Sequence, residues 1–131
     1  MKCSHKREDC GIVIRFDGEL GHHEAAQCME YLEKTMTLYA TEHIFLDLSG
    51  LTFMDSSGIA VVLNAQRGIL GAGQTLCVVG TPPTAMRIFK ASGILARVIF
   101  MPELPQMPES DHPEEEKEEE KETCPAAKST K

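Results

Sequence analysis

Short apolar runs alternate with amphipathic stretches along the first hundred residues of the chain. Four runs rich in β-branched or other apolar side chains predict four strands, at residues 12–16, 44–49, 75–80 and 98–100. The dipeptides Asp17-Gly18 and Ser49-Gly50 are turn signals, so we expect the first two strands to end there.

Between these strands, apolar residues recur three or four positions apart, which predicts three helices. The first stripe consists of Ala25, Cys28, Met29, Leu32, Met36 and Tyr39. The second runs from Ile59 to Leu70, and the third begins at Thr81-Pro82-Pro83 and stops at a predicted C-cap, Ser92-Gly93. This alternation predicts an α/β domain over residues 11–101, with a four-stranded, mostly parallel sheet and about three helices.

The composition changes abruptly at Pro102. Four prolines lie between residues 102 and 113, and a block of glutamates and lysines follows at residues 114–122. Because this stretch offers no apolar face to bury, residues 102–131 are predicted to form a disordered acidic tail. Such a tail either solvates the protein or serves in docking or regulation, and the sequence leaves both open.

The formal net charge of −7 belongs mostly to that tail. From residue 102 onward, ten acids and four lysines give a net charge of −6, which leaves −1 for residues 1–101. The predicted domain therefore has no basic stripe, and direct nucleic-acid binding is not expected.

The sequence lacks the features of membrane-spanning, secreted and metal-binding proteins. No apolar run approaches the roughly 20 residues of a membrane span, and the polar amino terminus shows no secretory signal, so we expect a cytoplasmic protein. The five cysteines form no C-x-x-C pair and the five histidines are scattered. We therefore predict free thiols, no metal site and no disulfide framework.

The most distinctive stretch is Asp55-Ser56-Ser57-Gly58, between a predicted strand and a predicted helix. A helix amino end carries unpaired N–H groups and a partial positive charge, so a Ser or Asp there caps the helix and an added anion is tolerated. Capping alone is the simplest interpretation. One cap needs one side chain, however, so a second hydroxyl is left for a kinase to reach.

Enzyme motifs are missing. The sequence contains no phosphate-binding G-x-x-x-x-G-K-[ST], no G-x-G-x-x-G after the first strand, no G-x-S-x-G and no H-E-x-x-H. A base for the serines beside Asp55 would have to be His22 or His23. We therefore expect a protein that is not an enzyme and that needs no cofactor.

Over about residues 11–101 the chain resembles the STAS-domain anti-sigma factor antagonists of bacteria. The resemblance rests on residues 17–23, 44–48 and 82–94, and above all on residues 51–59 with their Phe-Met-Asp-Ser-Ser-Gly segment. It implies that Ser57 accepts a phosphate from an anti-sigma factor that is also a serine kinase. It further implies that the unphosphorylated form captures this kinase and so frees a sigma factor, and that a PP2C-type phosphatase restores that form.

The resemblance also implies the roles of the neighbouring residues. Ser56 would cap the helix, and Asp55 would hold the turn or contact the kinase. The predicted partner-binding set is Gly21, His22, His23, Asp55, Ser56, Ser57 and Gly58. The chain departs from the family at Gly21, where members often carry an acid, and in its acidic tail. A STAS scaffold subunit of a signalling or transport complex, never phosphorylated, therefore stays open as the alternative function.

Overall fold

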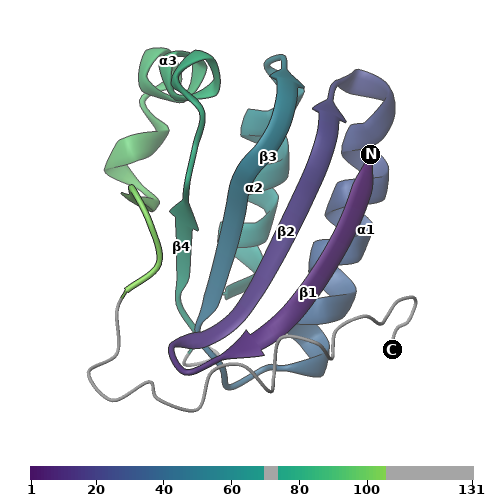
Figure 1. Ribbon diagram of the computed structural model, residues 1–131, viewed down its shortest axis with the longest axis vertical. Helices are drawn as coiled ribbons and strands as arrows, with labels where there is room; N and C mark the ends of the chain where they lie inside the picture. The colour runs from purple at the N-terminus through teal and green to yellow at the C-terminus, as the bar shows by residue number, and fades with distance from the viewer. Residues whose placement is uncertain (70–73, 106–131) are drawn as a thin grey trace.

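The computed structural model describes residues 1–69 and 74–105, and its central feature is a five-stranded sheet (Figure 1). In chain order the elements are β1 Lys2–Glu8, β2 Gly11–Leu20, α1 His22–Leu38, β3 Ile44–Met54, α2 Ser57–Ile69, β4 Leu76–Val79, α3 Pro83–Ser92, the 3₁₀ turn η1 Ile94–Ala96 and β5 Ile99–Met101. The end of the second predicted helix, at residues 70–73, and the predicted tail from residue 106 onward lie outside the described residues.

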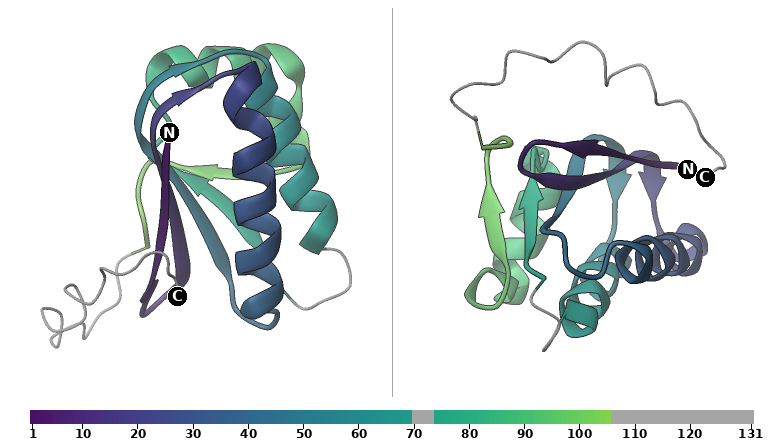
Figure 2. Two further views of the ribbon diagram at one scale, coloured as in Figure 1. Left: turned by 90° about the vertical axis from the view of Figure 1, so that its right-hand side faces the viewer. Right: turned by 90° about the horizontal axis from the view of Figure 1, so that it is seen from below.

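The strands lie side by side in the order β1-β2-β3-β4-β5. β1 and β2 form an antiparallel hairpin, whereas β2 to β5 are parallel. Each parallel connection moves one strand further in the same direction, and right-handed crossovers then place the connecting helices on the same face. Figure 2 shows α1 and α2 together against that face. The α/β class, the parallel pairing and the three helices are confirmed.

One face of the sheet and the helices enclose the main core. Its fully buried side chains include Ile12, Ile14 and Phe16 of β2, Leu46 and Leu48 of β3, and Val61 and Val62 of α2. A smaller buried cluster of Val13, Phe45, Cys77 and Val79 lies apart from this core. The alternation of these residues along β2 and β3 explains the split, because successive side chains of a strand point to opposite faces.

The predicted strand number is wrong by one, because the polar residues Lys2–Glu8 form β1. This strand has few β-forming side chains and is held by main-chain pairing with β2. Its side chains add contacts to the helix-side layer. The His5 Nδ1 atom lies 2.6 Å from the Tyr31 hydroxyl oxygen, and Arg7 donates to Glu42 at 2.9 Å.

The two predicted strand ends at Gly18 and Gly50 are also wrong, since β2 continues to Leu20 and β3 to Met54. The pairing of β2 with β3 shifts register twice, between Arg15 and Asp17 and between Gly18 and Glu19. β-bulges of this kind absorb turn-forming residues inside a strand. Gly50 is also required by packing, because a Cβ there would lie 2.8 Å from Asp17 Cγ and only glycine leaves room for that carboxylate.

The ends of α3 are where the sequence predicts them. Pro82 is the N-cap and Gly93 is the C-cap, with a left-handed φ of 81° that favours glycine. Within the described residues, every helix is too short or too polar to cross a membrane.

Candidate functional site

The candidate site is formed where β2 and β3 end side by side. Leu20 pairs with Met54 in the parallel register, so the residues that follow each strand are neighbours in space. A hydrogen bond from the Asp55 N–H to the Leu20 carbonyl, at 3.3 Å, extends this contact beyond the strands. The first turns of α1 and α2 therefore lie together. Residues 21–23 and residues 55–58, the two halves of the predicted partner-binding set, are thus neighbours in space.

Asp55 caps α2. Its Oδ1 atom accepts the Ser57 N–H at 2.8 Å, and its carbonyl accepts the Gly58 N–H at 3.1 Å. The predicted cap, Ser56, is therefore wrong as a capping residue: its side chain is exposed, and only its carbonyl enters the helix ladder, accepting the Ile59 N–H at 3.1 Å. Asp55 takes the capping role because its carboxylate precedes the first turn of α2 and reaches the N–H of Ser57, two residues further on.

The same carboxylate joins the two helix starts electrostatically. The Ser57 N–H is the main cause that lowers the pKa of Asp55, and the Ser57 hydroxyl and the His22 N–H act in the same direction. Asp55 thus stays ionised at neutral pH, held by the Ser57 N–H of α2 and favoured by the nearby His22 of α1.

The start of α1 is built differently. Gly21 is its N-cap and has no side chain to contribute, so the Gly21 N–H donates instead to Glu24 Oε1 at 3.0 Å. A Cβ at Gly21 would lie 3.5 Å from Asp55 Oδ2 and 3.3 Å from Glu24 Oε1. A larger acid at this position would therefore stand between two existing carboxylates.

Four side chains of the site face solvent: His22, His23, Ser56 and Phe53. The two imidazole rings lie 5.6 Å apart in an edge-on arrangement. Phe53 is 51% exposed although it is a large apolar residue, and its ring would lie 3.7 Å from a Cβ at Gly21. Ser57 is partly exposed beside them. These residues add an exposed apolar ring, that of Phe53, to the polar side chains of the site.

Gly58 and Gly21 are buried, so they shape the site from below. A Cβ at Gly58 would lie 2.7 Å from Met54 Cγ, closer than real contacts allow. Glycine at this position therefore lets the first turn of α2 settle onto the end of β3.

Basic side chains are missing from the two segments that form this surface. Residues 16–33 and 43–66 contain no Lys or Arg, and among the predicted site residues only His22 and His23 can carry positive charge. Acids are present at Glu24 and Asp55. An anion added at Ser57 would meet the helix amino end and no lysine or arginine of these segments.

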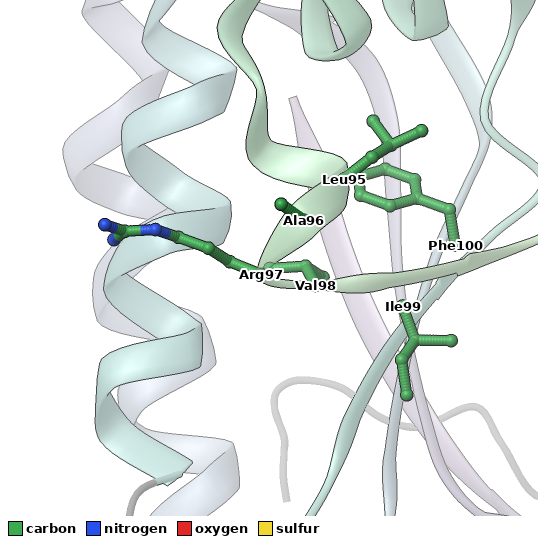
Figure 3. Close-up of a pocket in the computed structure, with 6 residues that line it drawn as sticks. All are labelled: Leu95, Ala96, Arg97, Val98, Ile99 and Phe100. Atoms are coloured by element: carbon green, nitrogen blue, oxygen red, sulfur yellow. The ribbon is translucent and has the colours of Figure 1, made fainter.

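A separate hollow of about 290 Å³ lies between η1 and β5, lined by residues 95–100 (Figure 3). Leu95 and Phe100 lie side by side there, while Arg97 extends away from them. None of the predicted site residues lines this hollow.

Two residues of the site were missed in the sequence. Glu24 accepts the main-chain N–H of the cap residue Gly21, and it was missed because Gly21 has no side chain that marks it as a cap. A Glu three residues after the cap is nevertheless a known signal of a helix start. Phe53 gave no signal, since Thr52 and Phe53 are both exposed between the buried Leu51 and Met54 and the alternation is broken.

Comparison with known proteins points to one family. A family model described as the STAS domain matches residues 4–106. The chain is 32% identical over 83 residues to proteins named anti-sigma F factor antagonist from Paenibacillus polymyxa and from Lysinibacillus sphaericus, covering 63% of this chain and 71% of each relative. The structure is similar to that of the Bacillus cell fate determinant SpoIIAA in its phosphorylated form, with 27% identity, a TM-score of 0.56 and coverage of 76% of this chain and 91% of that one.

Proposed function

This chain belongs to the STAS-domain family of anti-sigma factor antagonists, and we propose that it binds an anti-sigma factor that is also a serine kinase. Capture of the kinase by the unphosphorylated chain frees a sigma factor. Phosphorylation at Ser57 ends the capture, and a PP2C-type phosphatase reverses it. The chain acts as a regulatory binding protein and kinase substrate, and its cytoplasmic location stays a prediction from the sequence.

One observation carries this proposal: Asp55 supplies the cap of α2, so Ser57 is not consumed by capping. Its hydroxyl lies at a partly exposed helix start, beside the exposed Phe53 and the two histidines. A similar protein was solved in a phosphorylated form, which supports phosphorylation as the switch in this chain as well.

The effect of a phosphate on the isolated domain is small. It adds about −1.5 to −2 charges at the helix amino end. The helix field favours that charge by only about 0.3 to 1 kcal/mol, and the nearby carboxylate of Asp55 opposes it. The fold therefore persists after phosphorylation.

The effect on a complex is larger. Phe53 is the apolar anchor of the proposed binding surface, which comprises Gly21, His22, His23, Asp55, Ser56, Ser57 and Gly58. Burying a dianion there without a matching cation costs several kcal/mol. The segments 16–33 and 43–66 around Ser57 contain no Lys or Arg that could offset this cost. Phosphorylation therefore releases the partner and leaves the domain folded.

The test is phosphate incorporation by candidate anti-sigma kinases of the native host, with ATP and Mg²⁺, followed by intact mass. Wild type and Ser56→Ala should gain one phosphate, whereas Ser57→Ala should gain none. The phosphorylated form should also bind the kinase more weakly than the unphosphorylated form. Incorporation that survives in Ser57→Ala would place the acceptor elsewhere. Failure of every kinase, with stable capture of a different partner, would favour the unphosphorylated scaffold subunit.

A further inference from the structure

Cys3 and Cys28 lie 25 positions apart in the sequence, yet both face the space between β1 and α1. In the β1–β2 hairpin Cys3 is directly opposite Phe16, and His5 is opposite Ile14. Opposed residues of a strand pair share a face, and Phe16 and Ile14 belong to the core beneath the helices. The Cys3 side chain therefore points toward α1, where Cys28 is fully buried in the same core.

A neighbouring contact fixes the alignment of β1 with α1. The His5 Nδ1 atom lies 2.6 Å from the Tyr31 hydroxyl oxygen. Both elements run antiparallel to β2 and thus in the same direction (Figure 1). Moving back two strand residues from His5 covers about 6.6 Å, and moving back three helix residues from Tyr31 covers about 4.5 Å. These steps end at Cys3 and Cys28, so the two thiols face each other.

The two thiols differ in exposure and acidity. Cys3 is partly exposed and Cys28 is buried. The hydrogen bond from the Cys28 thiol is the main cause that lowers the pKa of Cys3, and the same bond, together with burial, raises the pKa of Cys28. Cys3 is therefore the better nucleophile, and Cys28 is the protonated neighbour within reach of it.

We infer that Cys3 and Cys28 form an oxidation-sensitive thiol pair that hydrogen peroxide converts into a disulfide between β1 and α1. The Cys3 thiolate attacks one peroxide oxygen, the O–O bond breaks, and the leaving hydroxide takes a proton to become water. The Cys28 sulfur then attacks the Cys3 sulfenic acid: an S–S bond forms, the S–O bond breaks, and a second water leaves with the Cys28 proton. Two thiols are oxidised, and one peroxide is reduced.

This inference is independent of the proposed function. Disulfides of proteins in reducing compartments are usually transient or regulatory, which suits a pair that is free in the reduced protein. The bond would tie the edge strand β1 to the helix whose first turn belongs to the candidate site.

The experiment uses the full chain and hydrogen peroxide, followed by non-reducing tryptic mapping. Each of the five cysteines falls on a different tryptic peptide, so every pairing has its own mass. The expected product joins the peptide of residues 3–6 to that of residues 16–34. The matched control pair is Cys77, a member of the smaller buried cluster, and Cys10, which packs against that cluster. A Cys10→Ser or Cys77→Ser variant should give the same product as wild type.

Single variants assign the roles. In Cys28→Ala, oxidised glutathione should modify Cys3, whereas in Cys3→Ser it should leave Cys28 unmodified. The oxidised wild type should also unfold at a higher urea concentration than the reduced form, because the bridge restricts the unfolded chain. The inference is overturned if the 3–6 to 16–34 product is absent or forms no faster than a Cys10–Cys77 product. A lower urea midpoint after oxidation would equally overturn it, since the native fold would then not hold the sulfurs together.

Discussion

Two helices, α1 and α2, begin side by side at one edge of the sheet, and different side chains accept the hydrogen bonds of the free N–H groups at their starts. α1 starts at a buried glycine, whose N–H is bound by Glu24 from within the helix. α2 starts behind Asp55, which caps from outside the helix. In the first arrangement the cap residue has no side chain of its own, which lets the start of α1 lie close to Asp55. The second leaves two serines at the start of α2, one exposed and one partly exposed, so we expect an added negative charge to be accepted more readily there than at Gly21, which faces two carboxylates.

The largest expected effect is on partner binding at the start of α2. Ser57→Glu should weaken binding to the anti-sigma kinase at least ~100-fold, about 3 kcal/mol, because the added charge is buried without a cation. The urea midpoint should barely change, since the charge lies at a helix amino end. Ser56→Glu is the matched control, with the same charge on the exposed neighbour, and calorimetry should find a smaller loss. Equal losses in both variants would contradict a specific role of Ser57.

The next effect is on stability beneath the same turn. Gly58→Ala should destabilise the domain by about 1–3 kcal/mol, since the new methyl overlaps the Met54 side chain. Gly68, in the last part of the same helix, provides the control: among the residues that the structure describes, a Cβ there meets Met36 Cε alone, at an ordinary contact distance of 3.6 Å. Gly68→Ala should stabilise by about 0.5–1 kcal/mol through helix propensity. Urea denaturation of both variants measures this difference, and a stable Gly58→Ala would show that Met54 moves aside.

A third prediction separates the charge of Asp55 from its capping bond. Asp55→Asn keeps a good capping side chain but removes the charge, whereas Asp55→Ala removes both, so the loss of stability should be larger for Ala. The pKa of Asp55 is lowered below its usual value of 3.8 in the folded state. The unfolded chain therefore binds the proton more readily, and the carboxylate stabilises the fold above that usual value.

The pH dependence gives this prediction its sign. The stability difference between wild type and Asp55→Asn should be full at neutral pH and should shrink as the pH falls through the folded-state pKa, below 3.8. Urea midpoints measured from pH 7 down to about pH 3 would follow it. A difference that does not change with pH would mean that the charge contributes nothing.

The smallest effect is expected at the start of α1. Gly21 has an ordinary extended conformation, with φ of −116°, so a larger residue is not strained there. Gly21→Ser should add a side-chain cap and raise stability by a few tenths of a kcal/mol, roughly the usual gain over glycine. Gly21→Asp should gain less, because its carboxylate faces Asp55 and Glu24. A larger gain for Asp than for Ser, in low-salt urea denaturation, would contradict the repulsion.

The sequence predicted the parts of the molecule that local patterns control. The helical stripes, the buried parallel strands and the Gly93 stop follow from periodicity and backbone preference, and the structure confirms them. The Asp55–Gly58 corner was found for the same reason, because a strand end followed by hydroxyl residues and a helix is a local pattern. The predicted partner contacts of that corner stay predictions.

Local patterns failed where distant residues decide the outcome. β1 is polar and becomes a strand because β2 offers it an unpaired edge. Gly18 and Gly50 resemble turn residues, but the register of β2 against β3 keeps them in the sheet. The cap fell to Asp55 because the end of β3 is held by Leu20, which places the carboxylate over the first turn.

The sequence by itself determined the three helices, the four apolar strands and the position of Ser56 and Ser57 between a strand and a helix, because these depend on side chains a few residues apart. Tertiary structure alone decided that Gly21 and His22 meet Asp55 and that Cys3 meets Cys28. Both encounters depend on strand register and on the path of α1 across the sheet, which are set by burial of the whole core and not by any one segment.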